Sequence, residues 1–136
     1  MLTRASVAKK LGLNPFARIV GHAAHAHAPA LFTTAPVFAM RKLMQKIGWG
    51  MNDVDFFEVN EAFAVVALIA QRDMGIEDER LNVNGGACAL GHPIGASGVR
   101  ILATLIAALQ NRNMKRGIAS LCIGGGEATA MAVELI

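Results

Sequence analysis

Residues 117–136, GIASLCIGGGEATAMAVELI, decide the fold. The apolar run Gly117 to Ile123 predicts a central strand, three glycines turn the chain, and Ala128 to Ile136 predicts its antiparallel partner. The preceding residues 96–110 are nearly apolar all round, which is typical of a helix buried on most sides. The stretch therefore predicts a strand pair layered against a buried helix.

Outward from this stretch, strands and helices alternate along the chain. Thr34 is expected to cap a helix that has Pro36 in its first turn and ends at Gly48. The remaining expected elements are a helix over 5–11, a strand over 17–24, a histidine-containing loop over 21–30, a strand over 55–59, a helix over 60–74 and a short strand over 81–83. This order predicts one α/β domain over residues 1–136, a mixed sheet layered with helices including one nearly fully buried helix.

The composition points to a surface that another polypeptide covers. Apolar residues make up 54% of the 136 residues, not counting 14 glycines, and Tyr is absent. This share of apolar residues is more than one small core needs, so we expect another subunit or domain to cover part of the apolar surface. The net charge is +3, and the acid-free residues 1–52 form a solvated basic face or a rim that attracts a polyanionic ligand such as a nucleotide cofactor.

Several functional classes are excluded by what the sequence lacks. It has no nucleic-acid-binding motif, no uninterrupted apolar stretch of membrane-spanning length and no secretory leader, so we expect neither a nucleic-acid nor a membrane partner. Cys88 and Cys122 lie in glycine-rich loops and not in a disulfide framework. We therefore expect a reducing, cytoplasmic compartment.

His92 is the first candidate functional residue. Pro93 follows it and favours extended backbone at His92 and the start of a helix directly afterwards. An imidazole at this place can donate a hydrogen bond to a carbonyl oxygen or accept a proton. The alternative, a glycine-rich turn whose histidine is only hydrogen-bonded, stays open.

Cys122 ends a predicted strand directly before three glycines. The amides of such a turn can form an anion-binding nest that favours a thiolate and stabilises an oxyanion. The alternative is an inert buried cysteine at a strand end. Cys88, between two alanines, is interpreted as a small apolar filler.

Asn60 has two interpretations that the sequence does not separate. Asn before a helix is a preferred N-cap, whereas a functional Asn uses its side chain to position a water molecule. His22, His25 and His27 have metal-like spacing, but no carboxylate or cysteine lies nearby in the sequence, so we expect no metal site.

Three motifs together resemble one family. Asn60-Glu61-Ala62-Phe63, the stretch from Gly91 to Gly98 and Cys122-Ile123-Gly124-Gly125-Gly126 are similar, in the same order, to the C-terminal half of the thiolases, the acetyl-CoA acetyltransferases and 3-ketoacyl-CoA thiolases. Residues 17–20 and 84–87 extend the resemblance along nearly the whole chain. The related ketoacyl synthases share the fold but have a histidine where this chain has Cys122.

The resemblance implies Claisen condensation or thiolysis on coenzyme A thioesters, in fatty acid metabolism. By motif, Cys122 would be the acid/base, and His92 would activate the nucleophile and donate to a thioester oxygen. Asn60 would hold the water that completes that oxyanion site, and the Gly124 amide would line the other. Phe63 and Ile94 would lie near the acyl and pantetheine end. Acyl-CoA and coenzyme A would be substrates, with no further cofactor and no metal, and the family forms homo-oligomers.

One departure from the family limits these expectations. The nucleophilic cysteine of thiolases lies in the N-terminal half, and neither Cys88 nor Cys122 fits it by motif. We therefore expect an N-terminal half and the first strand to be missing, and the isolated chain to be inactive. The chain would be a truncated gene product, a fragment or one piece of a split enzyme. The alternative is a non-catalytic remnant that binds acyl-CoA or dimerises. Chain-length preference and the direction of the reaction do not follow from the sequence.

Overall fold

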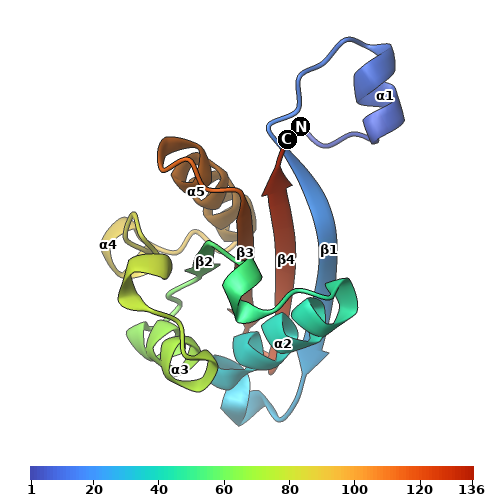
Figure 1. Cartoon of the computed structure of the whole chain (residues 1–136). Helices are drawn as coiled ribbons and strands as arrows, with labels where there is room; N and C mark the ends of the chain where they lie inside the picture. Colours follow the sequence, from blue (N-terminus) through green and yellow to red (C-terminus); the bar gives the residue numbers. More distant parts are fainter.

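A computed structural model describes residues 1–136, and its helices and strands alternate much as the sequence predicts (Figure 1). The elements are α1 (Ala5–Lys10), β1 (Ala17–Ala26), α2 (Ala35–Ile47), β2 (Phe56–Val59), α3 (Ala64–Met74), α4 (Ala87–Leu90), α5 (Ser97–Asn111), β3 (Arg116–Ile123) and β4 (Glu127–Leu135). Three short 3-10 helices lie at Pro29–Thr34, Met51–Asp53 and Asp78–Arg80.

The four strands form one mixed sheet in the order β1-β4-β3-β2. β3 and β4 pair antiparallel across the glycine turn, so the predicted hairpin is confirmed, and β1 pairs antiparallel with the outer side of β4. β2 pairs parallel with β3, with Val59 opposite Ser120. Because β2 and β3 run in the same direction, the residues that follow them come together at one edge of the sheet.

One face of the sheet is covered by α2 and, beside it, α3. The apolar residues of α2 recur at helical spacing, and Met40 and Leu43 are fully buried. α2 approaches β1 closely at Gly21, where a Cβ atom would lie 2.7 Å from the Ile47 side chain. A side chain at this position would therefore push α2 away from the sheet.

The other face is covered by α5 over β2 and β3. Ile101 and Leu105 are fully buried, and a Cβ atom at Gly117 would lie 2.6 Å from the Leu105 side chain. The outer face of α5 is open, however, and Val99 is 74% exposed. The prediction of a nearly fully buried helix is wrong for this chain, because the chain provides only one surface against which α5 packs.

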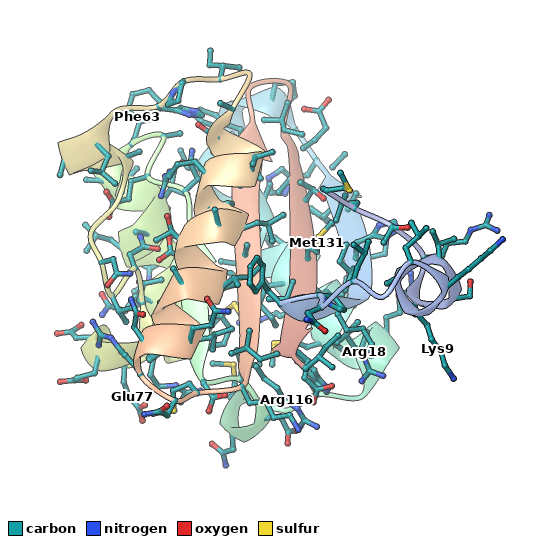
Figure 2. The ribbon with its side chains drawn as sticks, turned by 90° about the horizontal axis from the view of Figure 1, so that it is seen from above. Lys9, Arg18, Phe63, Glu77, Arg116 and Met131 are labelled. Carbon is teal, nitrogen blue, oxygen red and sulfur yellow. The ribbon has the colours of Figure 1, made fainter.

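On the face of the sheet that carries α5, the part formed by β1 and β4 is also only partly covered. Residues that face this side alternate with buried alanines on β4, and Figure 2 shows Met131 beside α5 on this open part. On β1 the residues His22 and Ala24 are exposed. α1 stands away from the sheet at the end where the two chain termini lie (Figure 1).

The predicted helix ends are confirmed where glycine sets them. Gly48 and Gly75 follow α2 and α3 with φ of 70° and 68°, the left-handed conformation that closes a helix. Residues 81–83 make only isolated bridges and no strand. The predicted loop over 21–30 is wrong for residues 21–26, because β1 extends to Ala26 and pairs with β4 on both sides of a register shift between Ile19 and Gly21.

Candidate active site

Asn60 follows β2 directly and is fully buried. Its backbone N–H donates to the Ser120 carbonyl at 2.9 Å, which continues the parallel pairing by one residue. α3 begins only at Ala64, and no side-chain hydrogen bond caps it. The N-cap interpretation of Asn60 is therefore wrong, and its side chain is available for the site.

His92 reaches the Asn60 carboxamide from the segment between α4 and α5. Its Nε2 lies 3.4 Å from Asn60 Nδ2, and its Nδ1 lies 2.5 Å from Ser97 Oγ. Ser97 is fully buried and donates in turn to the Pro93 carbonyl at 3.1 Å. The imidazole is therefore held on both nitrogens, and this contact excludes a histidine that is bonded only within its own turn.

A buried ion pair lies behind Asn60. Arg100 of α5 donates from Nη2 to Asn60 Oδ1 at 2.9 Å, and its Nη1 lies 3.7 Å from Glu58 Oε2. Neither Glu58 oxygen has a hydrogen-bond partner, and burial raises the pKa of the Glu58 carboxyl to about 7. The Arg100 charge lowers this pKa and the Glu61 charge raises it, but the loss of hydration is the largest effect.

Cys122 lies at the same edge of the sheet, one strand away from Asn60. Its thiol packs into the core under α2 and makes no hydrogen bond with Asn60 or His92. Burial raises the pKa of the thiol, and a hydrogen bond from its own backbone amide partly opposes this. Gly124, two residues further on, is exposed, and nothing lies within 4 Å of where its Cβ would be. The turn is thus open, while the thiol is kept protonated by its surroundings.

Cys88 is exposed, so its interpretation as an apolar filler is wrong. Its backbone N–H donates to Glu61 Oε2 at 2.9 Å, and Glu61 Oε1 accepts from Asn82 Nδ2 at 3.2 Å. Asn82 also bonds both the N–H and the carbonyl of Val59. The hydrogen bonds of Glu61 therefore connect the segment before His92 to Asn82 at the end of β2.

Phe63 and Ile94 lie on the surface of the same region. Their exposed fractions are 61% and 86%. Phe63 makes an edge-to-face contact with Phe32 at 6.0 Å between ring centroids, and Figure 2 shows it at the end of the molecule opposite Arg116. Two large apolar side chains are thus exposed near the polar site.

Two of the three N-terminal histidines have other partners, and the third, His22, is exposed. His25 stacks on Phe38, and His27 Nε2 lies 2.8 Å from the Leu31 carbonyl. No group of three or more His, Cys, Asp or Glu side chains is arranged to hold a metal ion. No helix is both long and apolar enough to cross a membrane.

Sequence reasoning missed Glu58, Ser97 and Arg100. Glu58 is the one charged residue in a strand that is otherwise apolar, which was a signal that it has a buried partner. Arg100 stands alone in an apolar helix, which was a similar signal. Their pairing, 42 residues apart, became visible only in the fold.

The fold and site define an α/β domain with an imidazole, a carboxamide and a thiol near the carboxyl ends of two parallel strands. Residues 13–135 match the sequence model of the family described as "Thiolase, C-terminal domain". The chain therefore belongs to the thiolase family, in its C-terminal domain.

Similar proteins agree with this assignment. The chain is 52% identical over 134 residues to a probable acetyl-CoA acetyltransferase of Dictyostelium discoideum, and 49% identical over 134 residues to an acetyl-CoA acetyltransferase of Allochromatium vinosum. Each match covers 98% of this chain, but only 32% and 34% of the relatives. The chain thus spans about a third of the length of these curated relatives.

Solved structures show the same correspondence. The Bacillus anthracis acetyl-CoA acetyltransferase superposes with a TM-score of 0.94 at 42% identity, covering 97% of this chain and 34% of that one. A thiolase from Ascaris suum, solved in complex with coenzyme A, superposes with a TM-score of 0.92 at 37% identity, covering 98% of this chain and 34% of that one. The expected thiolase-like mixed sheet is confirmed.

Proposed function

We propose that this chain supplies the acid/base half of an acyl-CoA C-acyltransferase site, which carries out Claisen condensation or thiolysis of 3-ketoacyl-CoA. The observation that carries the proposal is the contact between Asn60 Nδ2 and His92 Nε2 at the carboxyl edge of β2 and β3, beside the Cys122 turn. Acyl-CoA and coenzyme A are the substrates, with no resident cofactor. Two free cysteines suit a reducing, cytoplasmic compartment.

In the proposed condensation, Cys122 acts as the base. Its thiolate takes a proton from the α-carbon of an acyl-CoA, whose carbonyl oxygen accepts hydrogen bonds from His92 and from a water held by Asn60. The α-carbon then attacks the carbonyl carbon of an acyl group carried as a thioester on a cysteine of an N-terminal half. The acyl carbon–sulfur bond breaks, and that cysteine leaves as a thiolate.

The pKa of Cys122 fits a group that both gives and takes a proton. Burial raises this pKa, so the thiolate is a stronger base once it is formed, and the resulting thiol keeps the proton until the reverse step transfers it to the α-carbon. Thiolysis runs the same steps backwards, with Cys122 returning the proton to the α-carbon. The exposed amide of Gly124 would donate to the oxygen of the acyl group on the partner cysteine, and Phe63 and Ile94 would contact the acyl and pantetheine end.

The proposed site needs residues that these 136 positions do not contain. This chain spans about a third of the length of its relatives, and neither of its cysteines makes a hydrogen bond with His92, whose partners are Asn60 and Ser97. The open outer face of α5 and the uncovered part of β1 and β4 form an apolar surface that suits the missing N-terminal half. We propose that the isolated chain is inactive and that the assembled enzyme is a homo-oligomer.

Reconstitution tests this function. The N-terminal part of a similar acetyl-CoA acetyltransferase, up to the residue that aligns before this chain, is mixed with the full 136-residue chain, and thiolysis of acetoacetyl-CoA is followed. We expect activity in the mixture and in neither component alone. If the two parts form a complex without activity, the alternative of a non-catalytic acyl-CoA-binding or dimerising module is favoured.

The two cysteines provide a matched pair for assigning the role of Cys122. In the mixture, Cys122→Ala should block condensation while acetyl-CoA still acylates the partner cysteine, as measured by mass spectrometry. Cys88→Ala should retain both steps, because Cys88 is exposed and bonds only Glu61. Loss of acylation in Cys122→Ala would assign it a different role. A stable acyl adduct on the isolated Cys88→Ala chain would contradict the missing nucleophile.

A further inference from the structure

A line of polar groups leads from the buried ion pair to His92. It begins at Glu58 on β2, whose side chain is 2% exposed, and passes to Arg100 on α5, whose side chain is 20% exposed. Arg100 Nη2 contacts Asn60 Oδ1 at 2.9 Å, and Asn60 Nδ2 faces His92 Nε2. The site on the sheet edge is thereby connected to the helix that covers the sheet.

The direction of every hydrogen bond in this line follows from its two ends. Arginine has only donors, so Asn60 turns its oxygen to Arg100 and its N–H groups to His92. At the other end the Pro93 carbonyl only accepts, so Ser97 Oγ donates to it and accepts from His92 Nδ1–H. In the chain without substrate, both ends therefore assign His92 a proton on Nδ1 and a lone pair on Nε2. Nε2 must then take up a proton, as in activating the nucleophile, before it can donate to a thioester oxygen.

We propose that Arg100 is a positioning residue that fixes the orientation of the Asn60 carboxamide and, through it, the tautomer of His92. The proposal rests on the proposed function, because it deepens the role of that site. Without Arg100, the carboxamide has no donor that distinguishes its two ends. It then turns its oxygen to His92 as readily as its nitrogen, and the water-holding and proton-accepting groups lose their arrangement.

The contacts of Arg100 favour this role over simple stabilisation of the helix. α5 is held on the sheet by fully buried apolar residues such as Ile101 and Leu105, so its packing does not depend on the guanidinium. The guanidinium is 2.9 Å from Asn60 but 3.7 Å from Glu58, with no hydrogen bond to the carboxylate. Glu58 thus compensates the buried charge and leaves the donors of Nη2 to the carboxamide.

The test is the His92 tautomer in the full 136-residue chain, measured by two-bond ¹H–¹⁵N correlation at a pH where the ring is neutral. The His92 signals are assigned by their loss in His92→Gln. We expect the Nδ1–H form to dominate in the wild type, and Arg100→Met to shift the tautomer ratio towards Nε2–H by roughly 2- to 10-fold, the effect of one hydrogen bond. Arg100→Lys should restore much of the ratio, and the control Arg112→Met, at the residue that directly follows α5, should leave it unchanged.

An unchanged His92 tautomer in folded Arg100→Met would overturn the proposal. If Arg100→Met does not fold, Asn60→Asp decides, because Asp has no N–H to donate and His92 must then donate from Nε2. A retained Nδ1–H tautomer in Asn60→Asp would mean that the Asn60 nitrogen does not face His92, which also overturns the proposal. The measurement needs no N-terminal half and no substrate, so it fails or succeeds independently of the reconstitution. In a reconstituted enzyme, Arg100→Met should lower kcat by on the order of 10- to 100-fold with a smaller change in KM.

Discussion

The buried Glu58 carboxyl should make the stability of this chain depend on pH near neutrality. Glu58 is 1% exposed, and burial, opposed by Arg100, raises its pKa from 4.5 to about 7. At about 1.4 kcal/mol per pH unit, this difference corresponds to about 3 kcal/mol of unfolding free energy. Because the pKa is higher in the folded state, the native protein binds more protons, and its stability falls as the pH rises.

The window follows from the same two values. The contribution is fully present below pH 4.5, is lost as the pH rises from about 4.5 to about 7, and levels off above that. Urea denaturation of wild type and Glu58→Gln from pH 4 to pH 8.5 measures it. The difference in unfolding free energy between the two proteins should change by about 3 kcal/mol, the wild type losing stability relative to the variant, whose amide does not titrate.

Two results would refute this account. A difference curve that is flat with pH would show that Glu58 is hydrated in the native state. A wild type that gains stability relative to Glu58→Gln as the pH rises would show that the attraction of Arg100 outweighs the cost of burying the Glu58 carboxylate. If Glu58→Gln does not fold, ¹³C NMR of the Glu58 carboxyl gives its pKa directly, and a midpoint at or below 4.5 would count against the account in the same way.

Three further predictions concern packing, thiol exposure and the hydrogen bonds of Asn82 at the end of β2. Leu105→Ala should lower the unfolding free energy by about 2–5 kcal/mol in urea denaturation, because Leu105 is fully buried. Val99→Ala, on the open face of α5, should change it by less than about 0.5 kcal/mol, and equal losses in the two variants would contradict the layer arrangement. Iodoacetamide should alkylate Cys88 much faster than Cys122 in the native chain, and unfolding should remove the difference, as measured by mass spectrometry. Equal rates in the native chain would contradict the burial of Cys122. Asn82→Ala should cost about 1–3 kcal/mol, because it removes three hydrogen bonds at the end of β2; a change within 0.5 kcal/mol would show that these bonds contribute little.

The layered fold was readable from the sequence where single residues have strong local effects. Glycines 48 and 75 end helices through their left-handed backbone, and the apolar run before three glycines predicted the β3–β4 hairpin. The end of β1 was missed because alanine and histidine give no clear alternation of apolar and polar residues. Its strand character comes from pairing with β4, more than 100 residues away in the chain.

The site was predictable in its residues but not in their contacts. The motifs pointed to Asn60 and His92, yet the local N-cap interpretation of Asn60 failed because its side chain bonds Arg100, 40 residues away. The prediction that Cys88 is buried was also wrong. Its alanine neighbours suggested burial, but the fold places it on the outside of a short helix.

The adjacency of the start of β1 and the end of the chain has a practical consequence. Ala17 pairs with Leu135, and the Ile136 N–H donates to the Phe16 carbonyl at 3.4 Å. In a chain that begins at β1, a few flexible residues would join Phe16 to Ile136, so new termini can be opened elsewhere by circular permutation. The same geometry allows this domain to be grafted as a single insertion into a surface loop of a host protein, entering and leaving at one point.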